Sequence, residues 1–571
     1  MTVVPAGVRT SQRPPILARH VALATGHYLA TEAGMRMYRR GGNAIDAGVA
    51  AGICIDVLLP DLCNFGGVAP TMIYHRSTDE LVTISGLGTA GSGVSREHFM
   101  EHEAGVIPVG VKRSIVPGAP DAWLTALARY GRLTFDEVVQ PAIELCEGGF
   151  VVYPSLARNL GKEAADWLGW PSTAAIFAAA GGPPQAGEVL YQHDLANTFR
   201  RMAAAEAASG GGRAAGVEAA RDAFYKGDIG RELAAFIQEQ GGFISEADLA
   251  GFHSTVETPP SVPYRDVDVF ACGPWSTGPV NLQVLAMLEG VPLQEMQHNS
   301  AEYIHLFAEA FNLAFADRER YYGDPEQIDV PLEQLLSRTH AEAQRARIDP
   351  LRAFGGMPDA GLIPGMPPPA FGQVPLQADT SYVCAVDDEG NAFSATPSDG
   401  VGSTPIIPGL GLICSGRGSQ FWLEEGHPSV VAPGKRPRLT PNPAMAFRNG
   451  RLFMPFGTPG ADMQPQAMLQ TFVNIVDFGM NVQQAIESPR FGTFNYPESF
   501  WPHTYRPGRL SLEGRIPRAV GEQLAAMGHD LEWWPEWTRI AGNVCAITVD
   551  HERGTLQAGA DARAEAYALG W

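Results

Sequence analysis

Hydrophobic and polar positions alternate between helical and strand spacings along this chain. Residues 44–59 are almost wholly apolar and predict a buried helix. Apolar residues recur at helical spacing over 301–322, where Ser300 is a good N-cap. The Ala- and Gly-rich stretch 202–220 predicts a surface helix or loop.

Strand patterns are interleaved with these helices. The alternation of apolar and polar residues predicts strands at 71–74, 81–85, 381–386, 392–395, 444–448, 451–456, 544–549 and 555–558. Asn449-Gly450 suits a type I′ turn and strengthens one of the hairpins. A loop at 457–461 leads to a predicted helix over 463–478, with Asp462 as its N-cap. Such mixed runs favour a layered α+β fold.

One segment lacks any periodicity. Residues 355–377 are dense in Pro and Gly, which predicts a flexible linker and no ordered core element. The strand pattern resumes directly after it, so the chain is divided at this point.

Composition and charge exclude several classes of function. The chain has 571 residues, of which 45% are hydrophobic and 18% charged, so it can bury a large core. Its net charge of −21 repels phosphate backbones and anionic membranes, so we expect neither nucleic acid nor a membrane as partner. The first twenty residues lack the apolar core of a secretory signal.

The cysteines predict a reducing compartment. Their number, seven, is odd, no two form a C-x-x-C, and most lie in apolar runs. We therefore expect buried free thiols and a cytoplasmic protein.

Two motifs give only weak evidence for a cofactor or a metal. Residues 86–91 match G-x-G-x-x-G after a predicted strand, but no helix start follows, which favours a tight turn over a dinucleotide site. His98 and His102 have the spacing of metal ligands on one helix face, yet no third ligand cluster is evident. We expect no metal and no organic cofactor.

Thr380 opens a predicted strand directly after the linker. Cleavage before it would free an α-amine with an ordinary pKa of about 7.7–8.0. That amine could take the proton of the Thr380 hydroxyl, giving nucleophile and base in one residue. A Thr that merely starts a strand is the alternative.

Short segments with a distinctive order and spacing are distributed along the chain. They are Gly41-Gly42-Asn43-Ala44-Ile45-Asp46-Ala47, Val116-Pro117-Gly118, Phe224-Tyr225-Lys226-Gly227, Ala316-Asp317-Arg318, Gly323-Asp324-Pro325, Lys435-Arg436-Pro437, Gly457-Thr458-Pro459-Gly460 and Gly559-Ala560-Asp561-Ala562-Arg563. Together they resemble the γ-glutamyltranspeptidase family, from about His27 onward. The resemblance implies an N-terminal-nucleophile (Ntn) hydrolase with a four-layered αββα sandwich, made as a precursor that cleaves itself.

The same resemblance implies a division of the chain. Cleavage between Asp379 and Thr380 would give a large subunit, 1–379, and a small subunit, 380–571, which together form one αββα unit. The expected assembly is an α/β heterodimer from one precursor, with a dimer of heterodimers as a further option.

Catalytic roles carry over to matching positions. The resemblance implies Thr380 as nucleophile, the backbone amides of Gly460 and Ala461 as oxyanion donors, and Ser398 as the hydroxyl near the Thr380 amine. A helix start after the loop would add a favourable field for negative charge. A plain turn hydroxyl is the alternative for Ser398.

The family's groups for binding an amino-acid head group are missing. The matching positions hold Leu87 in place of an arginine, Leu439 and Thr440 in place of two serines, Ser419 and Gln420 in the segment of the aspartate, and Gly400 in place of an asparagine. Leu cannot replace a bidentate Arg–carboxylate contact. Arg417 lies close by in sequence and could bind a carboxylate in another geometry or pair with a surface acid.

These departures direct the functional hypothesis. We expect an autoprocessed threonine amidohydrolase or acylase that cleaves a small-molecule amide other than a γ-glutamyl one, with Leu87 and Leu439 suiting a neutral or apolar acyl group. One alternative is a true γ-glutamyltranspeptidase or glutathione hydrolase. Another is an uncleaved, non-catalytic homologue that acts as a binding protein.

Overall fold

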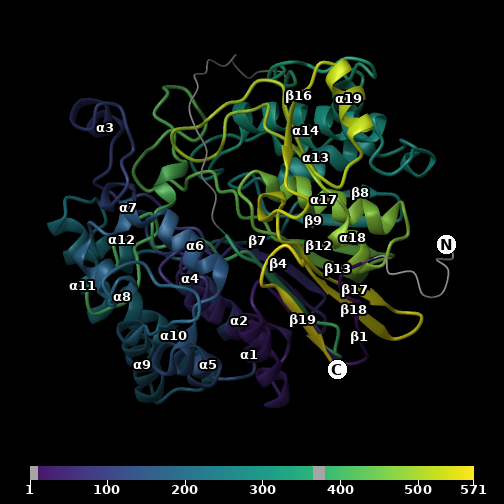
Figure 1. The fold of residues 1–571 in the computed structure, drawn as a ribbon. Helices are drawn as coiled ribbons and strands as arrows, with labels where there is room; N and C mark the ends of the chain where they lie inside the picture. The colour runs from purple at the N-terminus through teal and green to yellow at the C-terminus, as the bar shows by residue number, and fades with distance from the viewer. Residues whose placement is uncertain (1–10, 364–379) are drawn as a thin grey trace.

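Two stacked β-sheets form the centre of the protein in the computed structural model, which describes residues 11–363 and 380–571. Both sheets have seven strands, and helices cover their outer faces (Figure 1). This is the predicted αββα sandwich of the α+β class.

The first sheet holds the predicted hairpins of the C-terminal part. Its strands, from edge to edge, are β1 (Ile16–Ala18), β18 (Thr555–Ala560), β17 (Cys545–Asp550), β13 (Arg451–Gly457), β12 (Ala444–Arg448), β9 (Val267–Ala271) and β8 (Ser261–Tyr264). Neighbouring strands run antiparallel wherever they pair. Asn449 and Gly450 have φ of 52° and 69°, as a type I′ turn requires.

The second sheet brings together strands from both ends of the chain. Its order is β19 (Tyr567–Gly570), β2 (Ala22–Thr25), β10 (Val383–Val386), β11 (Ala392–Ala395), β3 (Thr71–His75), β4 (Glu80–Ile84) and β7 (Val256–Glu257). The strand that follows Thr380, β10, thus lies between two partners, β2 and β11.

Helices of the N-terminal part cover the second sheet. They include α1 (Tyr28–Arg39), α2 (Ala44–Leu58), α4 (Ala119–Tyr130), α5 (Phe135–Gly148), α9 (His193–Ala208) and α10 (Arg213–Tyr225). All residues of α2 are buried, as the apolar run predicted, and an Asn43–Asp46 capping box fixes its start. The stretch 202–220 proves to be parts of two helices, α9 and α10, which bury Met202 and Val217.

The other helical layer covers the first sheet. It contains α13 (Gly278–Leu288), α14 (Ala301–Tyr321), α17 (Met463–Val476), α18 (Val482–Glu487) and α19 (Arg518–Ala526). Ser300 caps α14 as predicted, because its hydroxyl accepts the amide of Tyr303. A small sheet of β14 (Phe491–Thr493), β15 (Arg509–Glu513) and β16 (Asp530–Trp534) flanks this layer.

The predicted linker begins as a fixed segment. The amide of Gly361 donates to Asp317 at 2.6 Å, its carbonyl accepts from the Tyr321 hydroxyl at 2.6 Å, and Ile363 is buried. Gly361 is therefore docked on α14, and the Met357 amide donates to the Tyr505 hydroxyl, contrary to the expectation of a linker that is flexible throughout. The rest of the linker and Asp379 lie outside the described residues.

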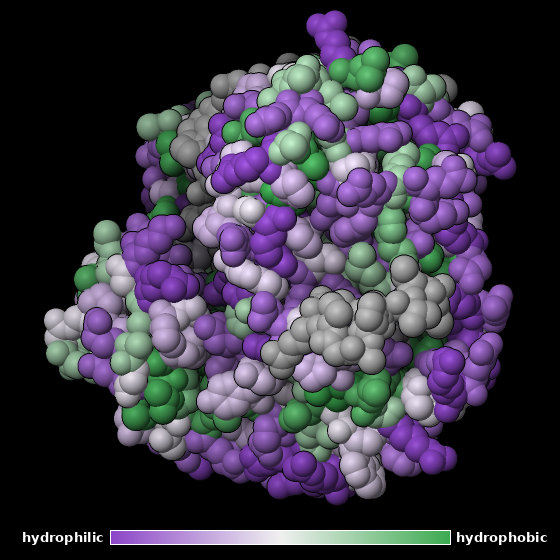
Figure 2. Space-filling model, turned by 45° about the vertical axis from the view of Figure 1, so that its right-hand side comes forward, coloured by the Kyte–Doolittle hydropathy of each residue, from purple (hydrophilic) through white to green (hydrophobic). Residues whose placement is uncertain are grey.

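The surface agrees with the large negative net charge of the chain. The face in Figure 2 is mainly hydrophilic, with only scattered hydrophobic patches. Within residues 11–363 and 380–571, no helix combines the length and apolar character needed to cross a bilayer. All seven cysteines are buried free thiols, and burial raises the pKa of Cys414 to about 12.

Side chains of β10 alternate between the two faces of its sheet. Val383 and Ala385 point to the helical layer, whereas Cys384 and Val386 join the core between the sheets. Tyr382 joins the same inter-sheet core, and its ring lies against Gly457, at the end of β13.

A side chain at Gly457 would separate the sheets. A Cβ there would lie 2.3 Å from the Tyr382 ring, whose hydroxyl bonds Ser394 at 2.6 Å and holds the ring in place. We expect Gly457→Ala to lower the free energy of unfolding by about 1–3 kcal/mol through overpacking, measured by denaturant unfolding. Gly148→Ala, on open surface of α5, is the matched control. Equal stability of the two variants would contradict this packing.

Candidate active site

Thr380 lies at the entry to an interior strand of its sheet. It directly precedes the segment that leads into β10 and is 1% exposed. The amide of Ser381 donates to the Pro397 carbonyl at 2.9 Å, and the amide of Gly26 donates to the Tyr382 carbonyl at 3.1 Å. These bonds fix the backbone on which the Thr380 hydroxyl is mounted.

Ser398 is the hydroxyl that meets Thr380. Its Oγ lies 2.8 Å from Thr380 Oγ1, and its amide donates to the Val68 carbonyl at 2.9 Å. The family resemblance implied a Ser398 hydroxyl near the Thr380 amine, and the structure brings the two side chains into hydrogen-bond contact.

Arg417 approaches Ser398 from the other side. Its guanidinium is fully buried and donates to Ser398 Oγ. Asp399 holds the guanidinium through a 3.3 Å contact of its Oδ1 with Arg417 Nε, and accepts the Ser415 hydroxyl on its other oxygen. Because a guanidinium has no acceptor, Ser398 must accept from Arg417.

Gly460 and Ala461 form the loop between β13 and α17. They have φ of 128° and 47°, and their carbonyls accept the amides of Met463 and Gln464 in the first turn of α17. Thr458 Oγ1 accepts the Asn543 amide at 2.7 Å and secures the start of the loop.

Asp462 does not cap α17 with its side chain, contrary to prediction. Its carboxylate accepts the amide of Ser499 at 2.8 Å and pairs with the buried Arg318. Arg318 in turn donates to the Pro497 carbonyl at 2.8 Å. The acid therefore connects the loop at Gly460 to the 497–499 segment.

Thr380, Gly460 and Ala461 line one cavity of about 950 Å³. Apolar and aromatic side chains of Leu62, Met463, Phe494, Phe500 and Trp534 form part of its wall. The nucleophile candidate and the two oxyanion candidates therefore face one space that can hold a small molecule.

The family assignment follows from comparison of the whole chain. The family model described as Gamma-glutamyltranspeptidase matches residues 30–571. The chain belongs to this family.

Its relatives include hydrolases of several specificities. It is 32% identical to the glutathione hydrolase-like YwrD proenzyme of Bacillus subtilis, covering 95% of this chain and 97% of that protein. It is 34% identical to the acylase ACY 1 proenzyme of a Pseudomonas species, covering 97% and 94%. The crystal structure of a cephalosporin acylase from Bacillus halodurans superposes with a TM-score of 0.86 at 27% identity, covering 100% of this chain and 99% of that one.

These relatives and the fold make the protein an Ntn-type amide hydrolase of the γ-glutamyltranspeptidase family. The comparisons include both glutathione hydrolase-like and acylase proenzymes, so family membership alone leaves the acyl group open.

The positions that lost the family's head-group contacts are packed inside the protein. Leu87 and Leu439 lie in one buried hydrophobic cluster with Trp275 and Phe421. Gln420 donates to the Thr440 hydroxyl at 3.2 Å, the Ser419 carbonyl accepts the Trp501 amide, and Gly400 packs on the backbone of Asp61. Among the described residues that line the Thr380 cavity, none of these six positions is found. That they shape the acyl site stays a prediction.

Two residues of the site carried no recognisable sequence signal. Asp399 has φ of 98°, unusual for a non-glycine residue, and holds Arg417. Glu498 lines the cavity while 4% exposed, and burial raises its pKa to about 9. Neither stands in a recognisable motif, because their partners come from other segments of the chain.

The G-x-G-x-x-G segment is part of the packed interior. The Thr89 carbonyl accepts the Val116 amide at 3.0 Å, and the Ala90 amide donates to Lys435 at 2.8 Å. The next helix, α3 (Arg96–His102), begins only five residues after Gly91. The segment thus agrees with a turn and lacks the strand–turn–helix context of a dinucleotide site.

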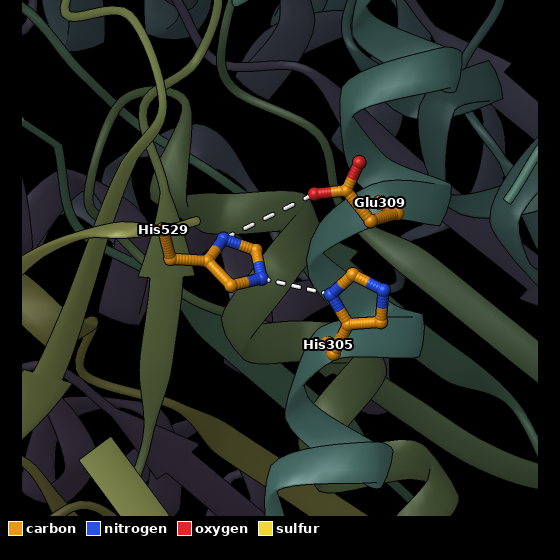
Figure 3. A group of neighbouring side chains, drawn as sticks. All are labelled: His305, Glu309 and His529. Carbon is orange, nitrogen blue, oxygen red and sulfur yellow. Dashed lines mark hydrogen bonds and ion pairs between the residues drawn. The ribbon is translucent and has the colours of Figure 1, made fainter. Parts of the chain in front are cut away.

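Two clusters of side chains contain histidines at distances that could suit a metal ion. His98 and His102 share α3 with ring centroids 5.2 Å apart, and His98 Nε2 lies 3.6 Å from Glu103. A second group, His305, Glu309 and His529, is buried between α14 and the turn before β16 (Figure 3). The His529 position is 224 residues from His305, so sequence spacing could not reveal this group.

Hydrogen bonds within the protein explain why the side chains of the second cluster lie close together. His305 Nε2 donates to the Asp349 carbonyl at 2.8 Å, which leaves His305 Nδ1 to accept from His529 Nε2 at 2.8 Å. Glu309 lies 4.0 Å from the other nitrogen of His529. Two nitrogens and one carboxylate are a ligand set that suits zinc, but here the rings bond one another.

The Gly460 backbone supplies a test of the oxyanion loop. A φ of 128° is open to glycine and strained for any L-residue. Because alanine disfavours this φ, the substitution Gly460→Ala should turn the loop backbone and move its amide out of line. We expect it to lower kcat of the amidase reaction by roughly 10²-fold or more, the size of losing one oxyanion donor.

The neighbouring position serves as the control. Ala461→Gly relieves a positive φ and keeps the amide, so activity should persist. If kcat survives Gly460→Ala, the loop does not bind the oxyanion.

Proposed function

We propose that this protein is an autoprocessed threonine amidohydrolase or acylase, with Thr380 as its nucleophile. Two observations carry the proposal: the contact of Thr380 with Ser398, and the cavity that Thr380 lines together with the Gly460–Ala461 loop. Family membership supplies the reaction class.

The proposed reaction has two halves. The Thr380 hydroxyl attacks the amide carbon while the freed α-amine of Thr380 takes its proton, and the oxyanion is held by the amides of Gly460 and Ala461. The amine then gives the proton to the leaving amine. Water next attacks the acyl-enzyme ester and releases the acid, so that Thr380 is restored.

Arg417 supports this chemistry through Ser398. Its donation polarises the Ser398 hydroxyl, which can then donate to Thr380 Oγ1 and stabilise negative charge there. The same cation lies near the site of the α-amine and keeps more of it neutral at pH 7. Arg417 is a positioning residue in this proposal and not the carboxylate receptor considered from the sequence.

The proposed product of maturation is an α/β heterodimer of residues 1–379 and 380–571, each contributing to the same sandwich. Strand β10 would then begin the small subunit while remaining hydrogen-bonded to β2 of the large one. A small-molecule amide is the proposed substrate, and neither metal nor organic cofactor enters the proposed steps.

Self-cleavage is the first experiment. Purified wild-type protein should run as two bands, and N-terminal sequencing of the smaller should begin at Thr380. Thr380→Ala should stay a single chain and lack amidase activity, whereas Thr380→Ser keeps a hydroxyl and should still cleave, more slowly. A single wild-type band, without activity on a panel of simple amides, would favour the non-catalytic binding protein.

Replacing Arg417 tests the positioning role. For the processed enzyme we expect Arg417→Met to lower kcat about 10–100-fold, the weight of a hydrogen bond to a charged group, with KM little changed. Loss of the cation raises the pKa of the α-amine, so the rising limb of the kcat–pH profile should move to higher pH.

Arg417→Lys keeps the positive charge but loses the planar guanidinium with its fixed donor geometry. It should leave the rising limb of the kcat–pH profile at the same pH while lowering kcat in part. If both variants shift KM alone, Arg417 contacts the substrate directly and the positioning role is wrong.

A further inference from the structure

The cluster of His305, Glu309 and His529 has the composition of a metal site. His305 and Glu309 lie one turn apart on α14, and His529 lies in the turn between α19 and β16 (Figure 3). Their ligand atoms, one from each residue, all lie within 4.8 Å of one another. Two imidazoles and one carboxylate at such distances are a set that suits zinc.

The carboxylate of this cluster is buried without a full positive charge beside it. Glu309 is 1% exposed, and its two oxygens accept the side-chain amide of Asn312 at 3.2 Å and the backbone amide of Phe354 at 3.1 Å. Within residues 11–363 and 380–571, no lysine or arginine nitrogen lies within 4.0 Å of it, and His529 Nδ1 lies at that limit. A buried carboxylate without a cation is costly, and a divalent ion held between it and the two rings would offset its charge.

His305 is oriented as a metal ligand. A carbonyl can only accept, so the contact of His305 Nε2 with the Asp349 carbonyl at 2.8 Å places the ring proton on Nε2. The lone pair of Nδ1 is thereby left facing His529. Histidine ligands commonly make this same bond from the nitrogen that does not bind the metal.

The contact between the two rings is close to the geometry that zinc requires. His529 Nε2 lies 2.8 Å from His305 Nδ1. Two nitrogens bound to one tetrahedral zinc at about 2.0–2.1 Å lie about 3.3 Å apart, so a shift of roughly half an ångström would admit the ion. His529 can make this shift because it follows Gly528 in a turn and is the most exposed of the three ligands, at 7%. Its ring proton would move from Nε2 to Nδ1, which faces Glu309.

We propose that His305, Glu309 and His529 form a zinc site. The ligands are Nδ1 of His305, Nε2 of His529 and one oxygen of Glu309, with a water molecule in the fourth position. None of the three is found among the described residues that line the Thr380 cavity, so the role of the ion is structural. The site revises the expectation of a protein without metal and leaves the proposed amidase steps unchanged.

The ligands come from both sides of the proposed cleavage. His305 and Glu309 belong to residues 1–379, and His529 belongs to residues 380–571. A zinc ion bound by all three would therefore join the large subunit to the small one after processing. This consequence rests on the proposed processing, whereas the zinc site itself does not.

Zinc binding to the metal-free protein is the first test. The full chain, treated with EDTA, should bind one Zn²⁺ tightly in calorimetry, and Zn²⁺ should raise its Tm because the ion binds the folded form. Mg²⁺, which prefers oxygen ligands, should leave the Tm unchanged. Co²⁺ in place of zinc should give the strong visible absorption of a four-coordinate ion. Failure of the wild-type chain to bind zinc would overturn the proposal.

Conservative variants separate ligation from hydrogen bonding. His529→Gln keeps an N–H donor for His305, and Glu309→Gln keeps an acceptor for the Phe354 amide, but each removes a ligand. We expect each to weaken zinc binding by about 100-fold or more, beyond the 10–100-fold that loss of a hydrogen bond to a ligand typically costs. The Tm of each metal-free variant should stay near that of the metal-free wild type and should no longer rise with Zn²⁺. Zinc binding as tight as in the wild type would overturn the site.

The other histidine pair supplies the matched control. His98→Gln removes one member of the pair that His98 and His102 form on α3, and it should leave zinc binding unchanged. If binding is lost in His98→Gln but survives in His529→Gln, the ion lies at α3 and the proposed site is wrong.

The uncleaved variant distinguishes failure of the site from failure of the proposed function. Thr380→Ala should bind zinc as tightly as the processed protein. In the processed wild type, size-exclusion chromatography should show the subunits separating at a higher urea concentration with Zn²⁺ than with EDTA. If zinc binds but the wild type stays a single chain, the processing is wrong and the zinc site stands. If the chain is processed and active but binds no zinc, the site is wrong and the amidase stands.

Discussion

The close packing of two sheets face to face determines where chemistry can occur in this protein. Thr380 enters β10 in one sheet, and the Gly460–Ala461 loop leaves β13 in the other. Both strands are interior to their sheets, with a hydrogen-bonded partner on each side, which fixes their positions. The contact of Tyr382 with Gly457 ties the two sheets together beside the cavity. The proposed nucleophile and the proposed oxyanion loop, which come from distant segments, are thereby held in fixed relation, as preorganised catalysis requires.

Buried ion pairs hold the loops around this centre. Arg417 with Asp399 lies behind Ser398, and Arg318 with Asp462 joins the start of α17 to the 497–499 segment. Buried pairs contribute little net stability, because desolvation offsets their attraction, but removing one partner is costly. Their effect here is positional: each pair fixes a loop that has no regular secondary structure.

Recognition and catalysis have separate structural origins in this chain. The catalytic candidates retain the family pattern, whereas two of the head-group positions, Leu87 and Leu439, are part of a hydrophobic cluster. We therefore expect the substrate-binding groups among the residues that line the Thr380 cavity. This arrangement is consistent with a family whose relatives here include both a glutathione hydrolase-like protein and acylases.

The sequence by itself determined the elements and the catalytic pattern. Apolar periodicity predicted α2 and α14, and Asn449-Gly450 predicted the hairpin of β12 and β13, because local propensity and core burial agree there. The family pattern pointed to Thr380 and Ser398, which the structure places in contact.

Only the tertiary structure decided the surroundings of that pair, since they depend on contacts between residues far apart in the chain. Asp462 stands where a helix cap is expected from the sequence, but its carboxylate pairs with a buried arginine 144 residues away, Arg318. From the sequence, Arg417 was a candidate to bind a substrate carboxylate. In the structure it is buried and donates to Ser398 Oγ. Glu498 carries no motif, and it stands out only because it is buried in the cavity lining with no hydrogen-bond partner for its carboxylate among the described residues, which spacing along a chain cannot show.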